Sequence, residues 1–86
     1  MKKLERTLKV FANARRLAIL KFLKSHREAK VSDIAKEIHL SFKSTSRHMN
    51  LLFAASLVDR DQHRLEMHYR LTPAALPLIK SILDLE

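Results

Sequence analysis

The stretch from Val31 to Leu52 constrains the fold of this chain more than any other part. Its apolar residues have the spacing of a short helix followed by a longer helix, and His39-Leu40 between them is a turn. Ser41 directly after the turn is a suitable N-cap, because its hydroxyl can accept a hydrogen bond from a free amide of the longer helix. The outer face of that helix is polar and basic, and no acidic residue occurs between positions 40 and 58. This pattern predicts a helix-turn-helix motif.

Helices are also predicted on both sides of this motif. Asn13 is the predicted N-cap of the second helix, Ser32 of the third, and Thr72, followed by Pro73, of the last. Val31 is expected to form a residue or two of strand before the third helix. The predicted helices are Lys2–Ala12, Ala14–Ser25, a short helix after Ser32, a helix that Ser41 caps and that runs to Ala55, and Pro73–Leu85.

Period-two alternation replaces the helical spacing after the fourth helix. A strand begins at Leu57-Val58, Asp61–Arg64 is the predicted polar tip, and Leu65–Leu71 alternates apolar and polar residues as a second strand does. The predicted order is therefore α-α-α-α-β-β-α. We expect a mainly α fold with a small β-hairpin, a winged helix-turn-helix, as a single domain over residues 1–86.

Glycine and cysteine are both absent, and each absence excludes functions. Without glycine the chain cannot form glycine-rich phosphate loops, and its left-handed turns must use other residues, for which His39 and Ser56 are the predicted positions. Without cysteine it has no disulfide or thiolate metal site. No apolar run approaches the ~20 residues of a membrane span, so we expect a cytoplasmic protein without a membrane partner.

Positive charge is concentrated in the N-terminal third of the chain. The formal net charge is +8, and residues 1–30 carry ten lysines and arginines against two glutamates. A chain this basic favours an anionic partner, most simply nucleic acid, although a solvated basic surface is the plain alternative. Together with the helix-turn-helix pattern, the charge favours double-stranded DNA.

Three blocks of the sequence resemble ArsR-type winged-helix repressors. Phe11–Leu20 is similar to the opening segment of that family, residues 40–58 to its recognition-helix signature, and Tyr69-Arg70-Leu71 to the end of its wing. The resemblance covers about residues 4–83. It implies a dimeric DNA-binding transcriptional regulator with two recognition helices in successive major grooves of a palindromic operator. It does not extend to metal sites of that family, because Lys30–Asp33 stands in place of the sensory cysteines and the last helix has no histidine.

The predicted DNA-binding residues lie on the recognition helix, on the wing and at the start of the third helix. Lys43 and Arg47 can neutralise phosphates, and Arg47 can also bind a guanine edge with two hydrogen bonds. Three members have alternatives: Phe42 packs on the turn, Thr45 is buried in the core, or His48 packs against the wing. The full set is Lys30, Ser32, Ser41, Phe42, Lys43, Ser44, Thr45, Arg47, His48, His63 and Arg64.

The first and last helices are together too apolar for a lone subunit. The last helix has apolar residues on two adjoining faces, of which one suits the core and the other a partner. We therefore expect a symmetric homodimer formed by these two helices. The candidate interface residues are Leu4, Leu8, Leu76, Ile79 and Leu83.

The wing also carries side chains that could ligate a metal: Asp59, Asp61, His63, Glu66 and His68. Their spacing matches no established pattern, so no metal site and no cofactor is predicted. Arg60 and Arg70 are instead expected to pair with acids of this set across the strands. No acid–base pair stands in an apolar setting, so the chain is not expected to be an enzyme.

Two other functions stay open. A winged helix can bind a protein partner without reading DNA, and a small basic domain can bind RNA, although this chain lacks the aromatic platform of single-strand readers. The sequence does not identify a small-molecule inducer.

Overall fold

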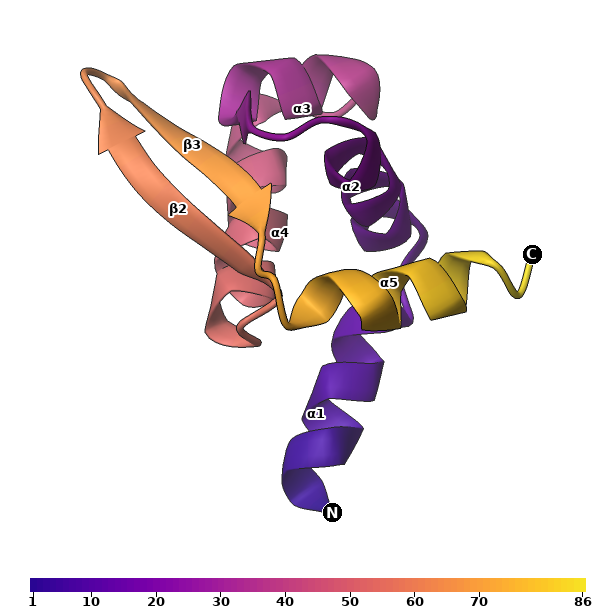
Figure 1. Ribbon diagram of the computed structural model, residues 1–86. Helices are drawn as coiled ribbons and strands as arrows, with labels where there is room; N and C mark the ends of the chain where they lie inside the picture. Colours follow the sequence, from indigo (N-terminus) through magenta and orange to yellow (C-terminus); the bar gives the residue numbers. More distant parts are fainter.

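The computed structural model describes residues 1–86 as five helices and a small sheet (Figure 1). The recognition helix is α4, and the wing is the hairpin of β2 and β3. The elements in chain order are α1 (Lys2–Phe11), α2 (Ala14–Ser25), β1 (Ala29–Lys30), α3 (Val31–Glu37), α4 (Phe42–Ala54), β2 (Val58–His63), β3 (Glu66–Leu71) and α5 (Ala75–Leu83). None of the helices is long and apolar enough to cross a membrane.

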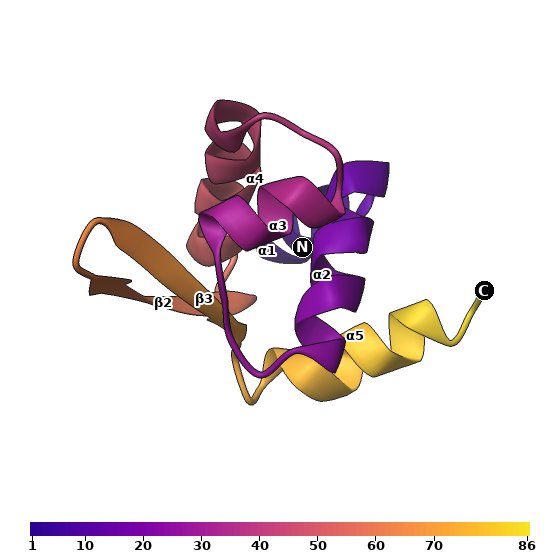
Figure 2. The ribbon, with the colours of Figure 1, turned by 90° about the horizontal axis from the view of Figure 1, so that it is seen from above.

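The three strands form one antiparallel sheet in the order β1-β3-β2. β2 and β3 pair over their full length, from Val58 opposite Leu71 to His63 opposite Glu66, whereas β1 pairs with β3 at two positions only. The hairpin therefore projects beyond the helices as a two-stranded ribbon, which is visible in both ribbon views (Figures 1 and 2). This is the predicted winged helix-turn-helix.

A single hydrophobic core lies between α2, α3, α4, α5 and the inner face of the sheet. Ile19 and Leu20 of α2, Ile34 of α3 and Leu52 of α4 are fully buried in it, and Ile79 closes it from α5. Helix α1 contributes Phe11 at its C-terminal end, and the rest of α1 projects away from the body of the molecule (Figure 1). Most of α1 is therefore exposed in a single subunit.

Two predicted helix caps are confirmed and a third is wrong. Asn13 accepts a hydrogen bond from the backbone N–H of Arg16 at 3.0 Å, and Ser41 accepts one from that of Ser44 at 3.1 Å. Helix α3, however, begins at Val31, and the short strand comes one residue earlier than predicted. Ser32 therefore lies within the helix and cannot cap it.

The hairpin is longer than predicted. β2 continues through His63, and the turn consists of Arg64 and Leu65. The sequence predicts residues 61–63 as part of the polar tip, but in the structure their side chains alternate between the two faces of a strand. A polar strand exposed on both sides lacks the apolar alternation on which the prediction relied.

Helix α5 begins two residues after the predicted Pro73. Leu76 donates its backbone N–H to the carbonyl of Thr72 at 3.2 Å, but Pro77 has no N–H for the next carbonyl. The turn that starts at Thr72 is therefore separate from helix α5. The Thr72 hydroxyl accepts a hydrogen bond from the N–H of Ala75 at 3.2 Å, so it caps this separate turn, whereas the N-cap position of α5 itself is Ala74.

Three residues have left-handed backbone conformations without being glycine. His39 has a φ of 54° and Ser56 a φ of 61°, which confirms both predicted positions. Arg64 at the wing turn has a φ of 58°. Arg15 supports the first of these turns, since it donates to the carbonyls of Ile38 at 2.6 Å and His39 at 3.3 Å.

Candidate nucleic-acid interface

Helix α4 presents a polar and basic outer face. Phe42, Lys43, Arg47 and Asn50 are exposed, while Met49 and Leu52 seat the opposite side of the helix in the core. Phe42 is 53% exposed, so packing on the turn does not cover it. The hydroxyl of Ser41 is engaged in the cap, and it is exposed beside the first turn of the helix. The exposed set offers hydroxyl and amide donors, two cations and one apolar ring.

The cations of this face have no partner within the chain. All five ion pairs of the molecule involve α1, the segment before α3, or the wing strands, and none involves α4. Lys43 and Arg47 are thus free, and so is Arg64 at the tip of the wing. Exposed cations without an ion-pair partner, on α4 and at the tip of the wing, favour an external polyanion.

Thr45 corrects one sequence prediction. Its side chain is fully buried on the core stripe of α4 and its hydroxyl has no hydrogen-bond partner. It cannot reach a ligand from this position, so of the two interpretations of Thr45 the structure supports the core one.

His48 faces α2 rather than the wing. Its Nδ1 lies 3.3 Å from Nη1 of Arg16, and Nε of the same arginine donates to the carbonyl of Val10 at 2.6 Å. Because arginine only donates, the neutral imidazole accepts at Nδ1 and carries its proton on Nε2. Burial, together with the charges of Arg16, Arg15 and Arg47, lowers the pKa of His48 below 6.5. His48 can therefore meet a phosphate only as a neutral donor.

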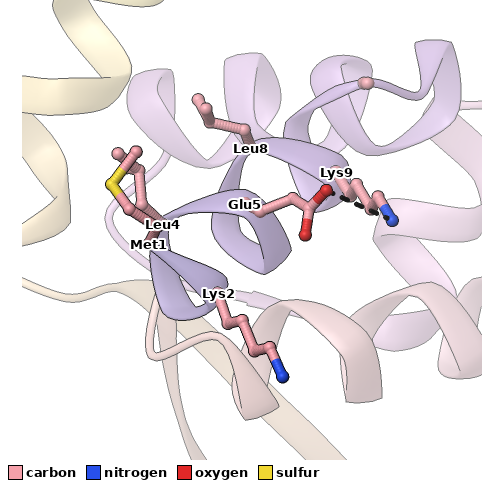
Figure 3. Close-up of a pocket in the computed structure, with 7 residues that line it drawn as sticks. Met1, Lys2, Leu4, Glu5, Leu8 and Lys9 are labelled. Carbon is pink, nitrogen blue, oxygen red and sulfur yellow. Dashed lines mark ion pairs between the residues drawn. The ribbon is translucent and has the colours of Figure 1, made fainter.

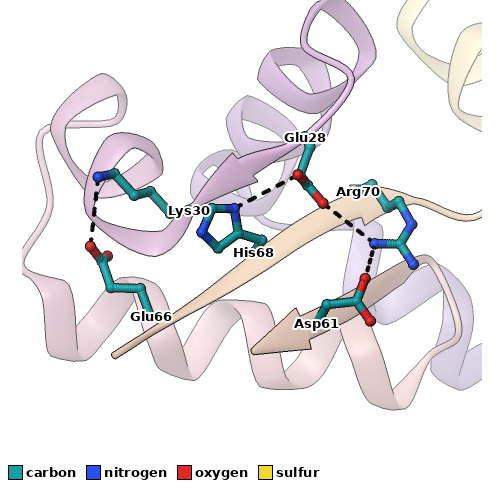
Figure 4. A network of polar contacts seen from close by, with 6 residues as sticks. All are labelled: Glu28, Lys30, Asp61, Glu66, His68 and Arg70. Carbon is teal, nitrogen blue, oxygen red and sulfur yellow. Dashed lines mark hydrogen bonds and ion pairs between the residues drawn. The ribbon is translucent and has the colours of Figure 1, made fainter. Parts of the chain in front are cut away.

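A carboxylate of the wing contacts Lys30 and Ser32, the predicted DNA-binding residues at the start of α3. The Glu66 carboxylate accepts from the backbone N–H of Ser32 at 3.4 Å and lies 3.8 Å from the Nζ of Lys30 (Figure 4). Hydrogen bonding from Ser32 is the largest cause that lowers the pKa of the Glu66 carboxyl, and the charges of Lys30 and His68 act in the same direction. Lys30 and Ser32 thus join α3 to the wing. Lys30 therefore differs from Lys43, Arg47 and Arg64, which have no ion-pair partner.

The two wing arginines have different roles. Arg70 pairs with Asp61 across the strands at 2.6 Å, as predicted, and the Asp61 carboxylate raises the pKa of Arg70. Arg60 does not pair with an acid. It stacks 3.8 Å from the ring centroid of Phe53 and donates to the amide oxygen of Asn50 at 3.1 Å. Arg60 therefore fixes the base of the wing against α4, a link that no local sequence signal indicates.

The outer face of the wing sheet carries a polar network (Figure 4). Glu28, just before β1, lies 3.7 Å from Nδ1 of His68 and 3.5 Å from Arg70. Glu28, Asp61 and His63 also bring one ligand atom each within 4.8 Å of one another. Asp61, His63 and His68 are among the possible ligands that the wing sequence offers, whereas Glu28 is more than 30 residues away from Asp61 along the chain.

An apolar strip on α1 is left uncovered. Leu4 and Leu8 are 53% and 55% exposed, and they point away from the ion pair of Glu5 and Lys9 on the other side of the helix (Figure 3). On α5, the prediction is wrong for Ile79, which is 1% exposed and belongs to the core. Leu76 and Leu83 are half-buried, whereas Leu78 and Leu85, which were not predicted, are exposed.

The helix-turn-helix of α3 and α4, followed by the β2–β3 ribbon, defines a winged helix-turn-helix protein. Its residues 6–81 match the family model described as "O-methyltransferase dimerisation domain". The chain belongs to this family. No curated protein sequence matches it closely.

Solved structures resemble the chain over nearly its whole length. One is the homodimeric winged helix-turn-helix DNA-binding domain of Mb0332 from Mycobacterium bovis, described as a possible ArsR-family transcriptional regulator. It is 25% identical, with a TM-score of 0.89 over 98% of this chain and 78% of that one. HlyU from Vibrio cholerae is 28% identical, with a TM-score of 0.85 over 98% of this chain and 91% of that one.

The antimony-specific transcriptional repressor AntR is a third relative. It is 25% identical, with a TM-score of 0.81 over 92% of this chain and 72% of that one. These likenesses confirm the resemblance to ArsR-type winged-helix regulators that the sequence predicts. The Mycobacterium bovis relative is described as a possible transcriptional regulator and AntR as a transcriptional repressor, in agreement with the expectation of a non-enzyme.

Proposed function

We propose that this chain is a sequence-specific, double-stranded DNA-binding transcriptional repressor that acts as a homodimer. The observation that carries the proposal is the unpaired cationic surface formed by Lys43 and Arg47 on α4 and Arg64 on the wing. An exposed α4 is the element that enters a major groove in this fold, and the wing tip reaches the adjacent backbone. The described function of the Mycobacterium bovis relative, a DNA-binding domain, supports the same assignment.

Each contact has a distinct role in this proposal. Arg47 binds a base edge or a phosphate, Lys43 neutralises a phosphate, and Phe42 contacts the methyl group of a thymine. The hydroxyls of Ser41 and Ser44 and Nε2 of His48 donate to backbone phosphates. His63 and Arg64 contact the DNA beside the groove that α4 occupies.

The dimer follows from the uncovered apolar strips of α1 and α5. Leu4, Leu8 and Leu78 are each about half exposed, and such strips are buried when a second copy packs on them. The matched family is described as a dimerisation domain, and the Mycobacterium bovis relative is described as homodimeric. A two-fold axis would place two copies of α4 in successive major grooves, about 34 Å apart, on a palindromic operator.

Selection of bound duplexes from a random pool tests the proposal. We expect a consensus with two-fold symmetry, and an affinity that falls steeply with salt because phosphate contacts release counterions. On that consensus, Arg47→Ala should weaken binding by about 1–3 kcal/mol if Arg47 reads a base.

Arg27→Ala is the matched control for this experiment. It removes the same charge from the connection between α2 and β1, which lies on the side of the molecule away from α4 (Figure 2). Equal losses for the two variants would contradict the role of Arg47, and no duplex selected at low salt would contradict the DNA-binding proposal.

A second candidate is a winged helix that binds a protein. It is favoured by the family match alone, since that family is described by dimerisation and not by DNA binding. In this case α4 packs on a partner chain and the positive charge is incidental. Salt-insensitive capture of one defined partner, with no duplex binding at low salt, would select this function.

A further inference from the structure

We infer that the outer face of the wing sheet holds a binding site for a divalent transition metal of the Zn²⁺ type. The site is formed by Glu28, Asp61 and His63, with His68 available as a fourth ligand. These residues come from three segments that are separate in the sequence: the connection before β1, strand β2 and strand β3. The inference concerns the wing alone and is tested without DNA, and one of its ligands, His63, is also a proposed DNA contact.

Strand register explains why these side chains meet. Asp61 lies opposite His68, and His63 lies opposite Glu66, so alternate positions of β2 and β3 project from the same face. Lys30 of β1 is paired with His68, which brings Glu28 to the edge of that face. The sheet thus gathers two imidazoles and two carboxylates beside one another.

The distances are close to those of a metal site. One ligand atom each of Glu28, Asp61 and His63 lies within 4.8 Å of the others, and the rings of His63 and His68 have centroids 4.7 Å apart. Ligands about 2.1 Å from a tetrahedral Zn²⁺ are roughly 3.4 Å from each other. A contraction of up to about 1.4 Å in the distances between ligand atoms closes the site, and exposed side chains make such movements by changing rotamer.

Donor chemistry selects the class of metal. Imidazole nitrogen with carboxylate oxygen suits Zn²⁺ and related transition metals, whereas Mg²⁺ and Ca²⁺ prefer more oxygen ligands. Four protein ligands, or three with one water, match the coordination number of Zn²⁺. The two carboxylates also offset the charge of the ion.

Arg70 is the competing cation at this site (Figure 4). Its guanidinium lies 2.6 Å from Asp61 and 3.5 Å from Glu28, so it now neutralises the two carboxylates that a metal would bind. A divalent ion must displace this single charge. Because the arginine side chain is long and 38% exposed, it can swing into solvent. Removal of Arg70 should therefore strengthen metal binding, an effect opposite to that of removing a ligand.

Calorimetric titration of the full chain with Zn²⁺ tests the inference. We expect one ion per chain, and His63→Asn should weaken binding by about tenfold or more, since even partners of metal ligands contribute about 10- to 100-fold. Arg70→Gln should tighten binding several-fold. His39→Asn is the matched control, because His39 is exposed, lies outside the wing and has a left-handed conformation that asparagine tolerates.

Two further measurements make the result unambiguous. Side-chain NMR resonances of His63 and His68 should shift with Zn²⁺ while those of His39 stay in place, and Asp61→Asn replaces His63→Asn if that variant fails to fold. Absence of Zn²⁺ binding, or equal affinity of His63→Asn and the unmodified chain, overturns the inference. An equal loss of Zn²⁺ affinity in His39→Asn also overturns the inference, because the effect would then not be specific to the wing.

Discussion

The unpartnered hydroxyl of Thr45 gives a quantitative test of the packing of α4. Its side chain is fully buried on the side of α4 that faces the core, and its Oγ1 has no hydrogen-bond partner. A buried polar group without a partner costs about 1–3 kcal/mol. Thr45→Val keeps the shape and replaces the hydroxyl with a methyl group, and the two residues have similar helix propensities. We expect the free energy of unfolding to rise by about 1 kcal/mol.

Urea denaturation and calorimetry at a fixed protein concentration measure this change. For a domain of this size, 1 kcal/mol corresponds to a rise in Tm of about 4–8 °C. Thr72→Val is the matched control, because the hydroxyl of Thr72 donates to the carbonyl of Ser56 at 3.0 Å and accepts from the N–H of Ala75 at 3.2 Å. It should destabilise the chain by about 1–2 kcal/mol. If Thr45→Val lowered the Tm while Thr72→Val behaved as expected, the reasoning on Thr45 would be refuted. The affinity of Thr45→Val for duplex DNA should match that of the unmodified chain.

Two other predictions concern assembly and pH. Leu8→Glu places a charge on the uncovered strip of α1 and should convert the proposed dimer to monomers in sedimentation velocity, whereas Leu65→Glu at the wing tip should not; a dimer that persists in Leu8→Glu would refute this interface. Because the pKa of His48 is lowered in the folded chain, its imidazole is protonated more readily in the unfolded chain as pH falls below 6.5. Stability should therefore decline from about pH 6.5 downward, and His48→Gln should flatten that decline in denaturant midpoints measured at several pH values; parallel curves for the two proteins would contradict it.

The helical part of the fold was predictable because its signals are local. Asn13 and Ser41 are strong N-caps with apolar stripes directly after them, and Met49 and Leu52 of the second stripe are fully buried in the core. Errors arose where a distant residue decides the outcome. The start of α3 is satisfied by the carboxylate of Glu66, 34 positions further along the chain, and not by a local cap.

The candidate interface was predictable in part. Periodicity identified the exposed face of α4, but it could not distinguish whether Thr45 belongs to that face or to the core. Glu28 was missed because a two-residue strand leaves no periodic signal, so its approach to Asp61 becomes visible only in the folded sheet. Arg60 was misassigned for the same reason, since its partner Phe53 lies on another element.

Three left-handed residues shape the side of the molecule that we propose to bind DNA. His39, Ser56 and Arg64 stand at the entry to α4, at its exit and at the end of the hairpin, and each has a Cβ that disfavours this conformation by about 1–2 kcal/mol. The rest of the domain therefore holds these three residues in a backbone conformation that they disfavour. A peptide excised around α3 and α4 would lack the rest of the domain and relax at the first of these residues, so the motif works as part of the whole domain and not as a portable fragment.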